Sequence, residues 1–252
     1  ESGVDPIRDI GIINLELILA DLESVAKRLD RAKNSAKSGD KKAKAEAELL
    51  ERIYVALSDE KPVRSVEFTE EEKKMVDEMF LLTSKPVLYA ANIDEKDMGK
   101  DENELPLVMK VKEFAAKEGN EVLVICAKTE EEISELDPAD AKMFLEDLGL
   151  EESGLDRLVK ASYKLLGLIS YLTAGEKETR AWTIKEGTKA PQAAGKIHSD
   201  FERGFIKADI VDYKTLLECG NYNKAKEAGK VRSEGKEYVM KDGDVVLFKF
   251  NV

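Results

Sequence analysis

The sequence predicts an α/β protein in which a helical hairpin precedes a β-α-β unit, with a small α+β domain at the end of the chain. Three observations indicate this fold class. Apolar residues recur at helical spacing near the start, two almost wholly apolar runs enclose a helical segment in the middle, and short strand-like runs follow Gly175. Helical spacing is typical of amphipathic helices, and short continuous apolar runs are typical of strands buried on both faces.

The first part of the chain has the pattern of two long helices joined by a turn. The first apolar stripe comprises Leu15, Ile18, Leu19, Leu22, Val25, Leu29 and Ala32. Ser38-Gly39-Asp40 interrupts it, and a second stripe runs from Ala47 to Leu57. A third helix is predicted from Thr69, which begins a capping-box sequence, to about Leu82. A structural arm is the favoured interpretation over a dedicated binding surface, because charged helix faces are usually only solvated.

The middle of the chain predicts a β-α-β unit. Residues 87–91 and 122–126 are the two apolar runs, and the helical segment between them ends at Gly119. The carboxyl ends of parallel strands meet at one edge of a sheet, where ligands bind. We therefore expect the loops 92–95 and 127–128 to lie together at such an edge.

The last part of the chain predicts helices and then short strands. Helices are expected over 141–148 and 155–166, and again over 190–198. Strands are expected over 180–184 and 205–211. The chain closes with two apolar runs around an Asp-Gly pair, which predicts a hairpin over 238–250.

Composition and charge exclude several classes of protein. A formal net charge of −12 argues against a surface that binds nucleic acid everywhere, although a local basic patch remains compatible with it. Cys126 and Cys219 lack the spacing of a disulfide framework or zinc site. No apolar run approaches the roughly 18 residues of a membrane span, and Glu1 to Pro6 lack an export signal. We expect a cytoplasmic protein that binds no membrane.

The sequence lacks the motifs that bind nucleotide phosphates. A phosphate-binding loop requires Gly-x-x-x-x-Gly-Lys-Ser/Thr, whose amides hold the phosphates while the hydroxyl binds Mg²⁺. The nearest candidate has Ala190 in place of the first glycine and Ile197 in place of the hydroxyl. The Asp-x-x-Gly pattern of a GTPase switch is absent as well. No catalytic or metal-binding residue is therefore assigned, and we expect this chain alone to be inactive.

The loop after the first predicted buried strand resembles the base-recognition loop of GTPases. That loop reads Asn-Lys-x-Asp, and its aspartate accepts hydrogen bonds from guanine, whereas this chain reads Asn92-Ile93-Asp94-Glu95. A glutamate is longer, and a carboxylate gains no hydrogen bond from adenine N1, which is itself an acceptor. Cys126-Ala127-Lys128 stands where GTPases carry Ser-Ala-Lys. Taken alone, so short a pattern often occurs by chance, and a polar loop between a strand and a helix is then the favoured interpretation.

The final third carries a more specific resemblance. Thr173-Ala174-Gly175, the residues 180–183 and 190–206, and the terminus 241–252 resemble the TGS domain of the YchF family of Obg-like ATPases. The hairpin and the loop 92–95 stand in that family's order. The resemblance implies a partial P-loop NTPase (G-domain) sheet, an inserted coiled-coil arm and a C-terminal β-grasp TGS domain of the α+β class.

The resemblance also implies a division of the chain. Residues 1–12 would be the tail of a truncated G domain, 13–82 the helical arm, 83–168 the remainder of the G domain, and 169–252 the TGS domain. The phosphate-binding loop, the switches and the Mg²⁺ ligands would precede Glu1.

The function implied by the resemblance is that of a ribosome-associated switch that binds and hydrolyses ATP with Mg²⁺ and prefers ATP to GTP. Asn92 and Glu95 would lie at the adenine edge, Ile93 would pack on the base, and Ala127 and Lys128 would close its other side. The alternative is a nucleotide-independent module that binds RNA or the ribosome, with the β-α-β unit as scaffold.

The expected partners are the ribosome and its RNA, through the helical arm and the TGS domain of a monomer. The final third is more basic than the rest, with Lys185, Lys189, Lys196, Arg203, Lys207, Lys224, Lys226, Lys230 and Arg232. His198, the only histidine, is interpreted as a structural residue at a helix end, because no acid or nucleophile of known role flanks it. Phe201, Phe205 and Tyr213 are interpreted as core residues rather than RNA-stacking groups.

Overall fold

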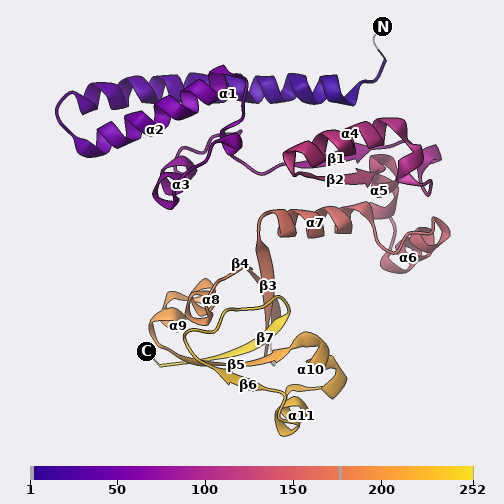
Figure 1. Cartoon of the computed structure of the whole chain (residues 1–252). Helices are drawn as coiled ribbons and strands as arrows, with labels where there is room; N and C mark the ends of the chain where they lie inside the picture. The colour runs from indigo at the N-terminus through magenta and orange to yellow at the C-terminus, as the bar shows by residue number, and fades with distance from the viewer. Residues whose placement is uncertain (1–2, 176–177, 252) are drawn as a thin grey trace. The chain divides into compact units, whose positions relative to one another are not determined.

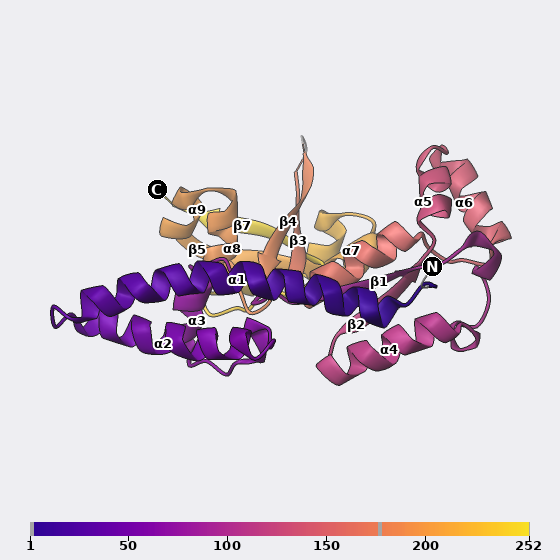
Figure 2. The ribbon, with the colours of Figure 1, turned by 90° about the horizontal axis from the view of Figure 1, so that it is seen from above.

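The structure is a computed structural model that describes residues 3–175 and 178–251. The chain divides into two compact units, Glu1–Leu158 and Val159–Val252. Figure 1 shows the course of the chain and Figure 2 a second view of it. Among the described residues, no helix is both long enough and apolar enough to cross a membrane.

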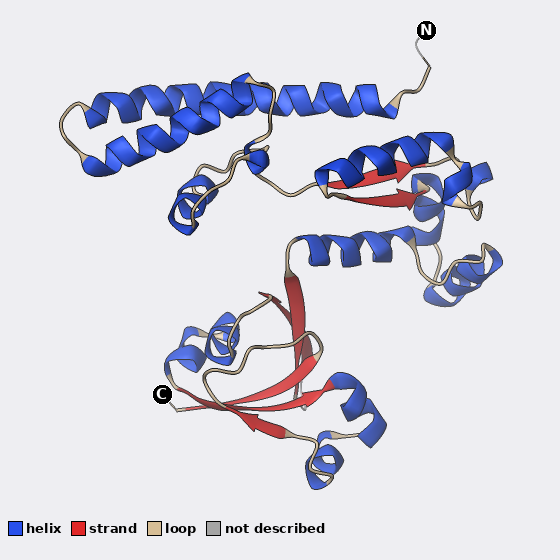
Figure 3. Ribbon diagram, viewed as in Figure 1, coloured by secondary structure: helices blue, strands red, loops and turns tan. Residues whose placement is uncertain are grey.

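The first unit begins with helices and continues with a parallel pair of strands (Figure 3). Its elements in order are α1 (Pro6–Ala36), α2 (Lys41–Ser58), the 3-10 turn η1 (Val63–Ser65), α3 (Glu70–Asp77), β1 (Leu88–Asn92), the 3-10 turns η2 (Glu95–Asp97) and η3 (Glu102–Glu104), α4 (Pro106–Glu118), β2 (Glu121–Ile125), α5 (Ala127–Ser134) and α6 (Pro138–Asp147). Helix α7 (Gly154–Leu165) carries the boundary between the two units.

Helices α1 and α2 lie side by side as a hairpin (Figures 1 and 2). Their shared core contains Val25 and Leu29 of α1 together with Leu50 and Ile53 of α2. The predicted stripe on α1 is buried only in part. Ile18 is 3% exposed, whereas its neighbour Leu19 is 54% exposed.

The predicted capping box at Thr69 is confirmed. The Thr69 hydroxyl accepts from the Glu72 backbone N–H at 3.3 Å, and the Glu72 carboxylate accepts from the Thr69 backbone N–H at 2.9 Å. The helix ends at Asp77, earlier than predicted. Phe80 has a φ of 53°, and a non-glycine residue in this left-handed region cannot continue a right-handed helix.

A buried carboxylate attaches the segment before β1 to the hairpin. Asp21 is 3% exposed and accepts hydrogen bonds from the backbone N–H groups of Leu82 at 2.8 Å and Thr83 at 2.7 Å. It also accepts from the Thr83 hydroxyl at 2.7 Å, and that hydroxyl accepts from the Val63 N–H at 3.0 Å. Buried charge is stable only when it is well hydrogen-bonded, and this carboxylate is.

The predicted β-α-β unit is confirmed. Strands β1 and β2 are parallel, with Leu88 opposite Glu121 and Asn92 opposite Ile125. Helix α4 connects them and contributes Val108, Val111 and Ala115 to the buried residues. It ends at Gly119, whose φ of 72° is the left-handed conformation of a helix C-cap.

The second unit is a five-stranded sheet with short helices. Its strands are β3 (Leu168–Ala174), β4 (Thr179–Lys185), β5 (Phe205–Asp212), β6 (Arg232–Glu234) and β7 (Asp244–Phe250), in the order β4-β3-β7-β5-β6. Its further helices are α8 (Ala190–Ile197), α9 (Ser199–Arg203), α10 (Tyr213–Cys219) and α11 (Tyr222–Glu227). Strand β3 runs parallel to β7, and the other pairings are antiparallel.

The core of this unit lies between the sheet and α8. Ala193, Ala194 and Tyr171 are fully buried and Phe248 is 8% exposed, because alanines let the helix approach the sheet closely. The predicted closing hairpin over 238–250 is wrong. Only Val239 forms a β-bridge, with Lys189, and β7 pairs with β5 and β3 instead.

We expect Asp21→Ala to lower the free energy of unfolding by about 3 kcal/mol, because it leaves buried N–H groups without an acceptor. Chemical denaturation followed by circular dichroism measures this change. Asp30→Ala is the matched control, since Asp30 is exposed on the same helix and makes no ion pair or side-chain hydrogen bond within the described residues. A loss as large for Asp30→Ala as for Asp21→Ala would contradict this role of Asp21.

Candidate functional site

The predicted base-recognition residues occupy two loops at one edge of the β1-β2 pair. Asn92 is the last residue of β1, and Ile93 and Glu95 follow it. Ala127 and Lys128 begin α5, directly after β2 and Cys126. Parallel pairing brings both loops to the same edge, because the two strands run in the same direction.

Hydrogen bonds connect the two loops. The Asn92 Oδ1 accepts from the backbone N–H of Ala127 at 2.9 Å. The backbone N–H of Ile93 donates to the carbonyl of Ile125 at 2.8 Å, which extends the strand pairing by one residue. The Asn92 amide therefore holds the first turn of α5 against the end of β1.

An ion pair also bridges the loops. The Lys128 Nζ lies 2.5 Å from Glu95 Oε2 and 4.0 Å from Glu132 Oε1. The hydrogen bond and charge of Glu95, with a smaller contribution from Glu132, raise the pKa of the Lys128 ammonium above its usual value. The structure thus brings Asn92, Glu95, Ala127 and Lys128 together, all of them exposed to solvent.

Sequence reasoning missed the residues that support these loops. Asp94 accepts from the Lys96 backbone N–H at 3.2 Å, and this bond lowers the pKa of the Asp94 carboxyl. Glu130 of α5 accepts from the N–H groups of Gly154 at 2.7 Å and Leu155 at 3.0 Å. A Cβ on Gly154 would lie 2.6 Å from the Glu130 carboxylate, so a larger residue there would displace that carboxylate. No local pattern could have revealed the two Glu130 contacts, because the partners lie 24 and 25 residues apart.

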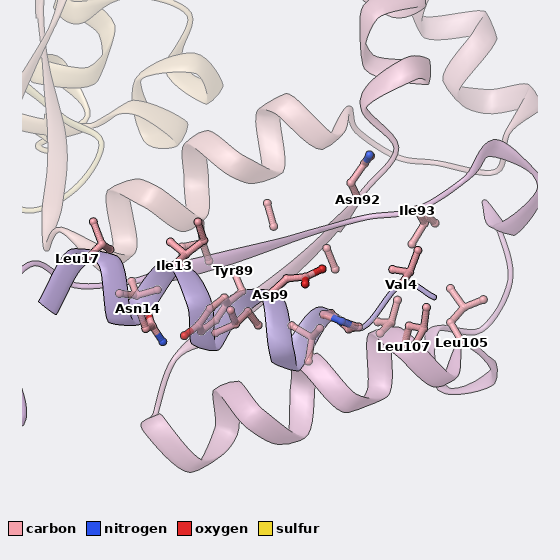
Figure 4. A pocket seen from close by; sticks show the side chains of 18 of the residues that line it. Val4, Asp9, Ile13, Asn14, Leu17, Tyr89, Asn92, Ile93, Leu105 and Leu107 are labelled. Atoms are coloured by element: carbon pink, nitrogen blue, oxygen red, sulfur yellow. The ribbon is translucent and has the colours of Figure 1, made fainter. Parts of the chain in front are cut away.

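A large pocket of about 940 Å³ lies beside the same strand (Figure 4). Its walls come from the N-terminal half of α1, from β1 and from the start of α4, and they are mostly apolar, including Ile13, Leu17 and Leu107. Asn92 and Ile93 line the pocket, whereas Glu95, Ala127 and Lys128 do not. Figure 4 shows the Asn92 side chain turned away from α4, which agrees with its bond to Ala127.

The site has groups suited to a nucleobase. Asn92 and Glu95 offer amide and carboxylate groups, and Ile93 offers an apolar contact. Within residues 3–175 and 178–251, no three His, Cys, Asp or Glu side chains gather as a metal site would need. Magnesium is usually held by carboxylates together with substrate phosphates.

The interpretations of the second unit hold for three of the four residues concerned. His198 caps α9, where its Nδ1 accepts from the Asp200 N–H at 3.2 Å, so it is structural. Phe205 is buried, and Phe201 is partly buried and stacks on Phe250 with ring centroids 3.8 Å apart. The prediction that Tyr213 is a core residue is wrong. Tyr213 is the first residue of α10, lies beside Gly243 and is 39% exposed.

We expect Glu95→Gln to lower the pKa of Lys128 towards that of a free lysine. In the native chain this pKa is raised, so while Glu95 is ionised the ion pair contributes fully below the ordinary lysine pKa and is lost as the pH rises through the raised value. NMR titration of the lysine side-chain signals measures the change. Glu132→Gln is the control and should have a smaller effect, since its carboxylate lies 4.0 Å away. An unchanged Lys128 pKa in Glu95→Gln would contradict the pairing.

Comparisons with known proteins show which family the chain belongs to. Residues 168–251 match the YchF-GTPase_C family, which is described as "Protein of unknown function (DUF933)". The chain is 59% identical to the "Ribosome-binding ATPase YchF" of Bacillus subtilis over 249 residues, which cover 99% of this chain and 68% of that protein. It is 41% identical to "Obg-like ATPase 1" of Pongo abelii, covering 100% of this chain and 64% of that protein.

A solved structure agrees with the sequence relatives. The chain superposes on the Schizosaccharomyces pombe YchF GTPase with a TM-score of 0.83 and 34% identity, covering 99% of this chain and 67% of that one. The matched segment is the C-terminal part of the longer relatives. On this similarity in sequence and fold, the chain belongs to the YchF family of Obg-like ATPases.

Proposed function

We propose that this chain supplies the base-recognition loops, the helical arm and the TGS domain of a switch protein that binds and hydrolyses ATP and associates with the ribosome. One observation carries the nucleotide part of the proposal. Asn92 and Glu95 meet Ala127 and Lys128 at the carboxyl ends of two parallel strands, where α/β proteins bind nucleotides. The name "Ribosome-binding ATPase YchF", borne by relatives, supports the ribosomal part.

Four parts follow from this proposal, with the boundaries expected from the sequence. Residues 1–12 and 83–168 belong to the G domain, 13–82 form the arm between them, and 169–252 form the TGS domain. The α1-α2 hairpin and the five-stranded sheet of the second unit support the proposal of an arm and a C-terminal domain.

Asn92 and Glu95 would define the edge of the base. Asn92 already uses its Oδ1 to position the first turn of α5, which leaves its amide nitrogen for a ligand. Ile93 is half-buried and would pack on a face of the base, while Ala127 and Lys128 would close the opposite side. Nucleotide sites commonly combine apolar walls with a few polar groups that fix orientation in this way.

The engagement of Glu95 favours ATP over GTP. A guanine-selecting carboxylate must be free to accept from two N–H groups of the base, and adenine has no such pair on that edge. In this chain the Glu95 carboxylate is bound to Lys128 at 2.5 Å. Relatives bear both names, ATPase and GTPase, so the preference itself rests on this geometry.

The phosphates and Mg²⁺ would be bound outside this site. The sequence contains no phosphate-binding loop, and the described residues contain no metal cluster. Magnesium supplies charge neutralisation at the transferred phosphate when it is bound. The relatives are longer than this chain, and we place the phosphate-binding segment in the part that they have in addition. Residues 1–252 alone should therefore not hydrolyse ATP.

A nucleotide-independent module that binds RNA or the ribosome is the second candidate. Residues 159–252 carry 17 basic and 13 acidic residues, a net charge of +4 in a chain whose total is −12. Electrostatic attraction to phosphates acts without nucleotide. In that case the β1-β2 unit would be a scaffold, and the cytoplasmic location expected from the sequence would be the same.

We expect Glu95→Asp combined with Ile93→Lys to shift nucleotide preference towards GTP in the full-length protein. The two changes restore the Asn-Lys-x-Asp pattern, so a shorter carboxylate can reach the guanine N–H groups, which should raise the GTP:ATP affinity ratio at least tenfold. Competition of unlabelled ATP and GTP against a fluorescent ATP analogue measures this ratio.

A matched control makes the same exchanges at exposed positions away from the site, with Glu71→Asp and Ile206→Lys. This variant should keep the native preference. Unchanged ATP selectivity in the Glu95→Asp, Ile93→Lys variant, with nucleotide still bound, would count against placing the base at these loops.

A further inference from the structure

The distal half of the hairpin is the most basic part of the first unit. Residues 24–46, which span the end of α1, the turn and the start of α2, contain eight basic and three acidic residues. Their net charge is +5 in a chain whose total is −12. Residues 1–23 have a net charge of −5 and residues 47–158 a net charge of −16. The end of the hairpin is therefore the part of this unit where positive charge is in excess.

Part of this charge surrounds a hollow between the two helices. The hollow has a volume of about 660 Å³, and its lining includes Ser24, Lys27, Arg28, Arg31, Ser35 and Lys42. Its only apolar residues are Ala32 and Ala43, both buried. A protein partner would need an apolar anchoring point, which this hollow does not offer.

Two of these cations have acidic partners within the hairpin. Lys27 lies 2.6 Å from Glu23, and Arg28 lies 2.7 Å from Glu46. Arg31 and Lys42, in contrast, are exposed and form no ion pair within the described residues. Exposed ion pairs on a protein surface contribute little to stability. Arg31 and Lys42 form no such pair in the part of the chain that the structure describes, so their positive charge is available to a ligand.

The spacing on α1 suits a row of phosphates. Lys27, Arg31 and Ser35 stand four residues apart, which places them on one helix face at steps of about 6 Å along the axis. The N-terminus of the 18-residue α2 also lies at this hollow, but the Asp40 carboxylate already accepts from the Lys42 backbone N–H there at 2.9 Å, so the cations rather than this helix end would hold a phosphate. Basic side chains and hydroxyls are among the groups that contact nucleic-acid phosphates.

We propose that this hollow, lined by Arg31, Lys42 and their neighbours at the end of the α1-α2 hairpin, binds the phosphate backbone of RNA. The proposal deepens the proposed ribosome association by giving it a contact surface, and rests on it for its biological setting. Binding would depend on the backbone rather than on sequence, because the hollow has no aromatic side chain on which a base could stack.

The test measures binding of residues 1–252 to a fluorescently labelled RNA hairpin by anisotropy over a series of salt concentrations. The variant is Arg31→Glu with Lys42→Glu. We expect its dissociation constant to rise at least tenfold, and the slope of log K against log salt to fall by roughly two, about one for each lost phosphate contact. Circular dichroism verifies that the helix content is unchanged.

The matched control is Lys74→Glu with Lys117→Glu. Both lysines are exposed in the same unit, on α3 and α4, and the variant changes the net charge by the same amount. It should keep near-native RNA affinity. Equal weakening by both variants would overturn the proposal in favour of a general charge effect, and unchanged binding by the Arg31→Glu, Lys42→Glu variant would overturn it directly.

Ribosome sedimentation separates this inference from the proposed function. If the hollow variant loses RNA binding but the full-length protein still sediments with ribosomes, the RNA site stands and other surfaces also hold the ribosome. If RNA binding is unaffected while sedimentation is lost, the hollow recognises an acidic protein and the RNA proposal fails, although ribosome association stands. Absence of sedimentation by the native full-length protein would contradict the ribosomal function, independently of the RNA result.

Discussion

Parallel pairing of β1 with β2 is the constraint on which the candidate site depends. Because the two strands run in the same direction, the residues that follow them meet at one edge, although they lie 35 positions apart in the chain. The hydrogen bond that the Ala127 N–H donates to Asn92 then fixes the start of α5. The ion pair between Glu95 and Lys128 is a second link between the two loops. An antiparallel pairing would place these residues at opposite ends of the sheet.

The hairpin is attached to this site through a second long-range contact. Asp21, in the middle of α1, binds the chain at Leu82 and Thr83, shortly before β1 begins. The partners are 61 and 62 residues apart, so this contact attaches the segment that leads into β1 to the hairpin despite their separation in sequence. Its cost in buried charge is offset by three hydrogen bonds to one carboxylate.

The sequence predicted those features that local chemistry determines. The capping box at Thr69, the end of α4 at Gly119 and the two buried strands each follow from a few neighbouring residues. The prediction of a closing hairpin was wrong because the Asp-Gly pair is only a local signal. Strand β7 pairs instead with β5 and β3, which are distant in sequence. The meeting of the two loops of the site could be predicted from the strands that precede them. The ion pair between Glu95 and Lys128 could not, because it depends on the side-chain rotamers of both residues.

The central claim is that the base of ATP binds between the loops 92–95 and 127–128. The most direct measurement is hydrogen-deuterium exchange on the full-length protein with and without a non-hydrolysable ATP analogue. The account predicts slower exchange in the peptides that carry Asn92 to Glu95 and Ala127 to Lys128, whose polar groups are exposed without ligand. Nucleotide binding that leaves exchange in both loops unchanged would contradict it.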